Sequence, residues 1–408
     1  MSAYSTIVLV TDSFPFGGVT ERSFVCPELK ALSQVARVVI MPLVRRGAQP
    51  DDVVLPQGVE VDSLLCDHVS MVHKLCRLRF LWQPSVYSSA AGDGYFTGLK
   101  QTLAAHELAY RLERWMESKS MRWDDTLFYS FWFGIGAYAM SLLASRHGAR
   151  YVSRAHRYDI YTRTAMGLRE SAVRHSAGVF AVSEAGAEAL RRDFPGCIEK
   201  IRVSMLGSEK THPESRSSRH EALSRRLTFL SVSRVAPEKR VHINFDMMRA
   251  LAVARPNTAV RWIHVGDGSD MSSLKSLVGD KIPVNLEVNF IGELPNSAVQ
   301  DIYLREPIDW FLLMSDSEGL PISICEAMSY GVPVAATDVG GVSEIVTDDC
   351  GMLLPDDVTP EEFVRGIVPY IDSDLRVCRM CDEAYRKWHD HFRADMLREE
   401  FVNNIMKL

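Results

Sequence analysis

The chain has 408 residues, and its 47% hydrophobic and 24% charged residues are ordinary for a globular protein with a sizeable core. At this length we expect two or three domains, and we favour two. The net charge of −6 argues against general nucleic-acid binding, and we expect no nucleic-acid partner.

The N-terminal stretch reads MSAYSTIVLVTDSF, with no basic start and an apolar run of only residues 7–10. A secretory signal needs both features, so none is expected here. No apolar run approaches the roughly 20 residues of a membrane-spanning helix. The eight scattered cysteines are expected to be reduced thiols. We therefore expect a cytoplasmic protein.

Short apolar runs alternate with longer helical patterns over the first half of the chain. The runs predict buried strands at 7–10, 38–41, 126–129, 151–153, 179–182 and 201–205. Helical windows fall between several of them, at 99–118, 134–147 and 183–193. This alternation is typical of a parallel sheet with helices on both faces.

Residues 45–98 are less regular and include MVHKLCRLRFLWQP at 71–84, which is basic and apolar with one Trp. Two interpretations stay open for this segment. It is either a contact with a membrane surface or a partly buried helix with a solvated basic edge, and we favour the second.

Residues 207–226 read GSEKTHPESRSSRHEALSRR, and this polar, Ser- and Arg-rich stretch predicts an exposed linker. Strands are then predicted at 227–232, 259–265, 287–291, 309–314, 332–336 and 351–354. We predict an α/β fold of two doubly wound Rossmann-like domains, 1–206 and 227–382, that face a central cleft. Ligands of such sheets bind beyond the carboxyl ends of the strands.

Residues 316–334, DSEGLPISICEAMSYGVPV, place Glu318 and Glu326 eight positions apart around a predicted helix from about 320 to 330. The backbone N–H groups at the start of a helix bind anions, and Gly319 permits close approach. Carboxylates accept hydrogen bonds from hydroxyls. A sugar nucleotide fits this mixture, but the alternative is that Glu318 only complements the helix dipole and Glu326 is solvent-exposed.

The stretch EGLPISICEAMSYGVPVAATDVGGVSEIV resembles the E-x7-E motif of the large retaining GT-B glycosyltransferase family, which includes glycogen synthase-like and bacterial polysaccharide enzymes. Further segments resemble other parts of this family in the same order: TDSFPFGGVTERSFVCPEL, SRAHRYDIY, LSVSRVAPEKRVH, VGDGSDMSSL, FIGELPNSAVQDIY and YRKWHDHF. The resemblance is weakest at 45–125. It implies that a C-terminal helix, 383–408, crosses back to the first domain.

The resemblance also implies residue roles. Arg234 and Lys239 would clamp the donor diphosphate, Glu318 would hold sugar hydroxyls, Glu326 the ribose, and His156 the donor sugar. Other donor contacts are implied for Gly17, Gly18, Gly266, Ile291, Gly319, Leu320, Pro321 and Ile322, and a shaping role for Gly340 and Gly341.

One position departs from the family pattern. Many members carry Gly after the donor-site His, whereas this chain has Arg157, which would add a phosphate contact instead.

No metal is expected. The D-x-D at Asp372–Asp374 has no strand before it. Cys378 and Cys381 have the spacing of zinc ligands, but they fall in a helical pattern without a second pair, which favours half-buried thiols.

The resemblance therefore implies a retaining glycosyltransferase that needs no cofactor and uses a UDP- or GDP-sugar. The acceptor would be a glycan or a lipid-linked molecule in the synthesis of surface polysaccharide or lipopolysaccharide, and peripheral contact with the inner membrane stays open. The alternatives are a sugar-nucleotide epimerase on the same fold and a non-catalytic sugar-nucleotide-binding protein. Slow hydrolysis of a donor would separate the catalytic readings from the last one.

Overall fold

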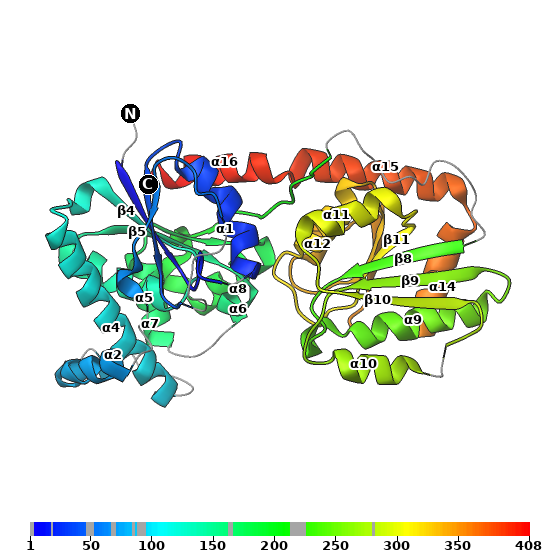
Figure 1. Ribbon diagram of the computed structural model, residues 1–408, viewed down its shortest axis with the longest axis horizontal. Coiled ribbons are helices and arrows are strands. Elements are labelled where there is room, and N and C mark those ends of the chain that lie inside the picture. The colour runs from blue at the N-terminus through cyan, green and yellow to red at the C-terminus, as the bar shows by residue number, and fades with distance from the viewer. Residues whose placement is uncertain are drawn as a thin grey trace. The chain divides into compact units, whose positions relative to one another are not determined.

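The computed structural model describes residues 4–17, 19–45, 53–66, 71–83, 86–87, 95–161, 166–212, 226–279 and 282–408. The chain forms two compact units (Figure 1). The first comprises Met1–Ser204 and Arg398–Leu408, and the second comprises Met205–Leu397.

The first unit contains a seven-stranded parallel sheet in the order β3-β2-β1-β4-β5-β6-β7. Its strands are β1 (Thr6–Thr11), β2 (Arg37–Pro42), β3 (Val59–Val61), β4 (Thr126–Ser130), β5 (Arg150–Ala155), β6 (Gly178–Ala181) and β7 (Ile201–Val203). Because helices cover both faces, β1 and β4 are buried along their whole length.

Alternate residues of β1 point into two separate cores of the first unit. One core lies under α4 (Tyr95–Ser118), α5 (Ile135–His147), α7 (Met166–His175) and α8 (Glu184–Asp193). The other lies under α1 (Val19–Leu32) and α16 (Ala394–Ile405), which Figure 1 shows on the opposite face. Shorter helices are α2 (Met71–Cys76), α6 (Arg157–Tyr161) and single 3-10 segments at 63–65, 77–82, 123–125 and 195–200.

A buried charge pair explains why α16 packs on this sheet. Arg154 of β5 is fully buried, and its guanidinium donates to the Glu28 carboxylate at 2.8 Å and to the Tyr129 hydroxyl at 3.1 Å. The ring of Phe401 on α16 lies 3.8 Å from the guanidinium carbon and covers it. A buried cation is tolerated only with such partners, so α16 completes the environment of Arg154.

The second unit contains a six-stranded parallel sheet in the order β10-β9-β8-β11-β12-β13. Its strands are β8 (Arg226–Val232), β9 (Ala259–Val265), β10 (Leu286–Gly292), β11 (Trp310–Leu313), β12 (Val334–Thr337) and β13 (Gly351–Leu354). One face is covered by α9 (Val241–Ala254), α10 (Met271–Val278) and α14 (Pro360–Ile371).

The other face of this sheet carries α11 (Asn296–Arg305), α12 (Ile322–Ser329) and α15 (Asp374–His391), as Figure 1 shows. A single turn, α13 (Val342–Ile345), and a 3-10 segment at 237–239 complete the unit. Both sheets confirm the predicted doubly wound α/β fold, and the predicted strands 259–265 and 351–354 coincide with β9 and β13.

The predicted linker 207–226 lies partly outside the described residues. Residues 207–212 are described, 213–225 are not, and residue 226 already begins β8. The C-terminal segment 383–408 is not one helix, because α15 ends at His391 and α16 begins at Ala394. Between them Arg393 forms a bridge with Ser208.

The favoured interpretation of segment 71–84 as a partly buried helix with a solvated basic edge is confirmed in part for its described residues, because Phe80 is buried, Leu81 is half-buried, and Lys74 and Arg79 are exposed. Several apolar side chains, Met71, Val72, Leu75, Leu78 and Trp82, are exposed as well, whereas Arg77 turns inward toward the buried Glu107 at 3.8 Å. Helical periodicity identifies a stripe but does not say which side of the stripe is covered.

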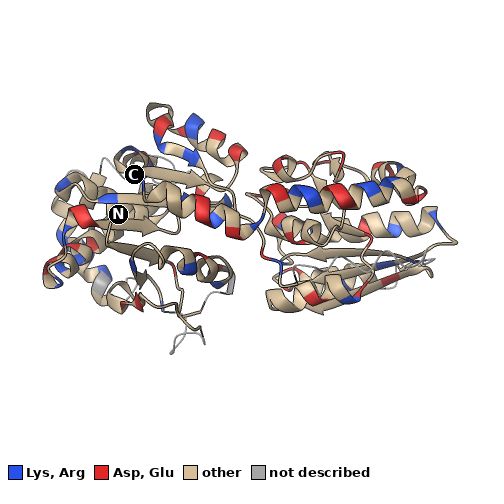
Figure 2. Cartoon of the chain, turned by 90° about the horizontal axis from the view of Figure 1, so that it is seen from above, with Lys and Arg blue, Asp and Glu red and all other residues tan. Residues whose placement is uncertain are grey.

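Charged residues of both signs are interspersed over helices and loops of both units, and the strands carry few of them (Figure 2). Among the described residues, no helix is long and apolar enough to span a bilayer.

The buried His264 of β9 gives the second unit a pH-dependent stability. Its Nδ1 lies 2.8 Å from the Ser231 hydroxyl, and burial lowers the pKa of the imidazole from 6.5 to about 4. The unfolded chain therefore binds a proton that the folded chain excludes between pH 6.5 and 4. The contribution of His264 to the unfolding free energy is fully present above pH 6.5 and is lost as the pH falls toward 4.

We expect His264→Gln to remove on the order of 3 kcal/mol of this acid-induced loss in unfolding free energy. Urea unfolding between pH 7.5 and 4 measures it, with the exposed His175→Gln as the matched control. Equal pH slopes for the two variants would contradict the assignment.

Candidate functional site

Two of the predicted site residues form a direct ion pair in the second unit. The Lys239 ammonium, in the loop after β8, lies 2.6 Å from Oε1 of Glu318, in the loop after β11. Glu318 is 5% exposed, so its charge requires a partner. Breaking such a pair leaves an uncompensated buried charge and is strongly destabilising. The pair therefore fixes two loops to one another.

Arg234 lies in the same loop as Lys239 but at its surface. Its side chain is 69% exposed, and its guanidinium pairs with Glu238 at 2.9 Å. Arg234 and Lys239 therefore lie on one loop, where the Arg234 side chain is exposed and the Lys239 side chain is half-buried.

Arg240 is a residue of this loop that the sequence reasoning missed. It adopts a left-handed conformation, φ 44°, at the start of α9. Its guanidinium donates to the carbonyl oxygens of Met314 and Ser315 at 2.9 and 3.0 Å and to the Asp356 carboxylate at 2.6 Å. Arg240 therefore pins the loop to the end of β11, and only the adjacent basic residues hinted at it.

The loop after β11 leads into α12, which begins two residues later than predicted. Pro321 is the N-cap, and Leu320 is buried before it. Ile322 and Ser323 form the first turn, where backbone N–H groups of a helix have no intrahelical acceptor. The predicted set Gly319, Leu320, Pro321 and Ile322 thus lies between Glu318 and the helix.

Two glycines allow the loops at this edge of the sheet to interlock. A Cβ on Gly340, φ +57°, would lie 1.9 Å from the carbonyl oxygen of Glu318, and the Gly341 N–H donates to the Gly319 carbonyl at 3.0 Å. A Cβ on Gly266, φ +136°, would lie 1.9 Å from the carbonyl oxygen of Ser233. Only glycine fits both positions.

Glu326 lies on α12, half-buried, and its Oε1 accepts a hydrogen bond from the side-chain amide of Asn296. Burial raises its pKa from 4.5 to about 7, and the Asn296 hydrogen bond opposes that rise. Its surroundings therefore differ from those of a solvent-exposed helix acid. Ile291, near the end of β10, is exposed.

His156 follows β5 in the first unit and is 9% exposed. Its ring lies 4.4 Å from the ring of Trp132 and 5.0 Å from that of Phe131, measured between centroids. Asp159 accepts the backbone N–H of His156 at 3.1 Å and lies 3.6 Å from Nδ1. Among the described residues neither ring nitrogen has a hydrogen-bond partner. Arg157 begins α6 directly after it.

The loop after β1 is organised by Glu21, another residue that the sequence reasoning missed. Its carboxylate accepts the backbone N–H groups of residues 12–14 at 2.7–2.8 Å and the indole N–H of Trp132 at 2.8 Å. Three successive amides form an anion-binding nest, which here holds an internal carboxylate. Gly17 follows with φ 97°, and Gly18 lies outside the described residues.

The polar pairs considered as metal ligands lie on helices. Asp372 ends α14 and pairs with Arg255, Asp374 begins α15, and Cys378 and Cys381 lie on α15. Within the described ranges, no group of three or more His, Cys, Asp or Glu side chains is arranged to hold a metal ion.

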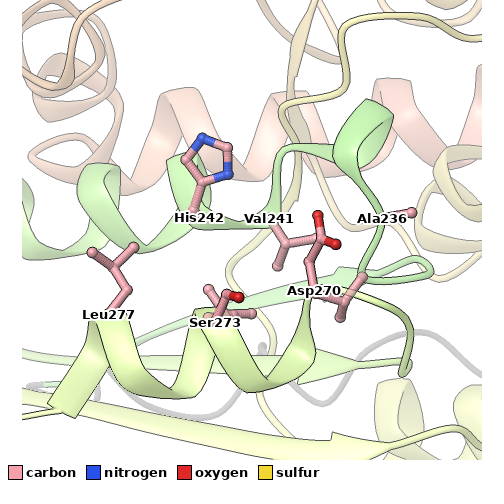
Figure 3. A pocket seen from close by; sticks show the side chains of 8 residues that line it. Ala236, Val241, His242, Asp270, Ser273 and Leu277 are labelled. Atoms are coloured by element: carbon pink, nitrogen blue, oxygen red, sulfur yellow. The ribbon is translucent and has the colours of Figure 1, made fainter.

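A pocket of about 440 Å³ lies between α9 and α10 (Figure 3). Val241 and His242 of α9 lie above Ser273 and Leu277 of α10 in this view. Asp270, at the start of α10, lies beside Val241. Val235 and Ala236 also line it, so it borders the loop that carries Arg234, although it contains none of the predicted site residues.

Comparison with known proteins identifies the second unit. Residues 214–388 match a family described as glycosyl transferases group 1. The match covers less than half of the chain and lies within the second unit. A putative teichuronic acid biosynthesis glycosyltransferase, TuaC of Bacillus subtilis, is 30% identical over 242 residues, which cover 58% of this chain and 58% of that protein. The chain thus spans little more than half the length of this relative.

Two solved structures share the fold of this chain. Sucrose-phosphate synthase from Thermosynechococcus elongatus has a TM-score of 0.72 at 13% identity and covers 99% of this chain and 98% of its own. Alr3699/HepE from Anabaena, in complex with UDP and glucose, has a TM-score of 0.67 at 19% identity and covers 99% of this chain and 100% of its own. These similarities establish the two Rossmann-like units of the GT-B fold.

The Gly340 position tests how closely the loop after β12 approaches the loop after β11. We expect Gly340→Ala to lower the unfolding free energy by about 2 kcal/mol more than Gly292→Ala does, because the new methyl group overlaps the Glu318 carbonyl. Gly292 also has a positive φ, 82°, but a Cβ there meets nothing within 4 Å. Urea unfolding measures both, and equal losses would contradict the close approach.

Proposed function

We propose that the chain is a retaining, metal-independent glycosyltransferase that moves a sugar from a nucleoside-diphosphate sugar to a glycan or lipid-linked acceptor in surface-polysaccharide or lipopolysaccharide synthesis. The observation that carries the proposal is the Lys239–Glu318 pair beside Arg234 and the start of α12, in the unit that matches the family.

The chemical task is to stabilise the charge that develops on the departing nucleoside diphosphate. We assign this task to Arg234, Lys239 and the backbone N–H groups at the start of α12. Charge-assisted hydrogen bonds contribute about 1.5–3 kcal/mol each. An ionised carboxylate has about four acceptor sites, so Glu318 can pair with Lys239 and still accept sugar hydroxyls.

The donor we propose is a UDP- or GDP-sugar whose ribose hydroxyls bind Glu326. The position of Glu326 on the helix that starts at this site supports the assignment, and the UDP in the Anabaena structure favours uridine. In the first unit, the buried ring nitrogens of His156 are proposed to bind sugar hydroxyls.

Three readouts separate this function from its alternatives. A thermal-shift screen across nucleoside diphosphates and their sugars identifies the base, since a ligand that binds only the folded state raises the melting temperature. Release of free nucleoside diphosphate excludes a non-catalytic binding protein, whereas conversion to a second sugar nucleotide without acceptor indicates an epimerase. The anomeric configuration of the product, read by NMR, tests retention.

Arg234→Ala is expected to lower kcat about 10- to 100-fold, because it removes one charge-assisted contact to the leaving group. The melting temperature should change little, since the side chain is exposed. Release of the diphosphate from the donor found in the screen measures the rate. Arg249→Ala, a partly exposed arginine of α9, is the matched control. Full turnover in Arg234→Ala and in Lys239→Ala would contradict the proposed role.

We further propose that residues 71–82 contact a membrane surface at which a lipid-linked acceptor is presented. Met71, Leu75, Leu78 and Trp82 follow a helical spacing, and each is more than half exposed, Trp82 by 90%. Lys74 and Arg79 are exposed beside them, and the segment contains no acidic residue. An exposed apolar stripe with basic neighbours fits the interface of an anionic bilayer.

The double change of Leu78→Ser and Trp82→Ser is expected to weaken binding to phosphatidylglycerol-containing vesicles about tenfold or more, because the lost apolar burial amounts to a few kcal/mol. Co-sedimentation measures binding. Val253→Ser removes an equally exposed apolar side chain from α9 and serves as the control. Unchanged sedimentation of the double variant would refute the contact.

A further inference from the structure

Asn296 and Gln300 connect Glu326 to the start of the second unit, although neither belongs to the predicted site. Both lie on α11, one turn apart. The Asn296 side-chain amide donates to Oε1 of Glu326, and its Oδ1 accepts from Nε2 of Gln300 at 2.8 Å. Gln300 is 2% exposed, so each of its polar atoms needs a partner.

The direction of this hydrogen-bond chain is fixed by the backbone of residues 209–211. The Thr211 N–H donates to Oε1 of Gln300 at 2.7 Å, and Nε2 of Gln300 donates to the Glu209 carbonyl at 3.0 Å. A backbone N–H can only donate and a carbonyl can only accept, so the Gln300 amide has one possible orientation. Its Nε2 must then face the oxygen of Asn296, and the Asn296 NH₂ must face Glu326.

The segment 209–211 is itself held against α12 and α15. The Tyr330 hydroxyl donates to Oε1 of Gln300 at 2.8 Å, and its ring stacks on Tyr303 with centroids 5.1 Å apart. The Lys210 ammonium lies 4.9 Å from the ring centre of Tyr330 and 5.0 Å from that of Tyr385. Cation–π contacts of this kind add to the hydrogen bonds that fix the backbone.

We propose that Asn296 and Gln300 are positioning residues: they hold the Glu326 carboxylate in one orientation for the ribose hydroxyls, and they tie it to residues 209–211. This inference rests on the proposed function, because it assumes that Glu326 binds ribose. It adds that the polypeptide just after Ser204, where the first unit's main segment ends, sets the geometry of the nucleotide site.

The electrostatics around Glu326 make the Asn296 donor necessary. Burial raises the pKa of this carboxyl to about 7, and the Asn296 hydrogen bond is what opposes the rise. The ionisable neighbours Tyr303, Tyr330 and Cys325 do not offset the raised pKa of Glu326. Burial and the charge of Glu326 raise their own pKa values. Asp301 acts on Tyr330 in the same direction, and the Lys210 ammonium lies over the Tyr330 ring.

Removing the Asn296 donor should therefore raise the pKa of Glu326 further. Without the Asn296 N–H, a larger fraction of Glu326 is protonated at neutral pH. A protonated carboxyl accepts hydroxyl hydrogen bonds less well than a carboxylate. Nucleotide affinity is expected to fall as the pH decreases through the pKa of Glu326, and this midpoint should move upward when the donor is lost.

The test uses Asn296→Asp in the full chain, because an aspartate keeps an acceptor for Gln300, loses the donor to Glu326 and adds a second carboxyl that raises the pKa of Glu326 further. Calorimetric titration with UDP and GDP, and with their 2′-deoxy and 3′-deoxy forms, is carried out from pH 5.5 to 8.5. Relative to the wild type, we expect about tenfold weaker binding of the ribose forms, a ribose-to-deoxyribose affinity ratio closer to one, and a higher pH midpoint. The ratio does not depend on the fraction of folded protein.

Two further variants control for charge and for local disruption. Asn296→Ala removes the donor without adding an acid and should lose the same selectivity. Ser297→Ala, the exposed next residue of α11, should keep the wild-type ratio and midpoint.

The outcomes separate this inference from the function on which it rests. If the wild type binds no nucleotide, or does not distinguish ribose from deoxyribose, the ribose contact of Glu326 fails and the inference falls with it. If the wild type discriminates and both Asn296 variants keep its ratio and midpoint, the positioning role is overturned and the proposed function stands.

Discussion

The second unit depends on a buried ion pair at the point where its strand order reverses. The sheet runs outward from β8 and β11 in opposite directions, so the loops after these two strands border the crevice in which doubly wound folds bind ligands. Lys239 comes from one loop and Glu318 from the other. Because Glu318 is buried, its charge holds both loops in place, and Arg240 and Gly340 then fix the same loops through the backbone.

In the first unit, a different buried carboxylate holds together the loops at the reversal of strand order. Its strand order reverses between β1 and β4, and Glu21 joins the loops after them by accepting the amides of residues 12–14 and the indole of Trp132. Trp132 in turn packs on His156, which follows β5. In each unit a buried acid therefore determines the shape of the loops at the carboxyl ends of the central strands.

The sequence was sufficient for the elements and for the cluster of acids and bases, but not for their partners. Alternating apolar runs predicted β9 and β13 because buried parallel strands have few alternative patterns. Lys239 and Glu318 were assigned to separate groups of a ligand, whereas they bind each other across 79 positions of the chain. Asn296 and Gln300 were not predicted, because a chain of hydrogen bonds between segments distant in the sequence produces no periodic pattern of residues. The apolar and basic residues at 71–82 were visible in the sequence, but which of them are exposed depends on the neighbours that cover the others.

The two acids of the E-x7-E pattern differ in how their burial is balanced. Glu318 has an ammonium 2.6 Å away, so its negative charge is compensated within the fold. The hydrogen bond that Glu326 accepts comes from a neutral amide, and burial raises the pKa of Glu326 to about 7. Two carboxyls of one short segment thus have different surroundings, as acids with different roles do in other enzymes. A carboxyl that titrates near neutrality is sensitive to one added or removed hydrogen bond, which is why the network behind Glu326 has to be fixed in direction as well as in place.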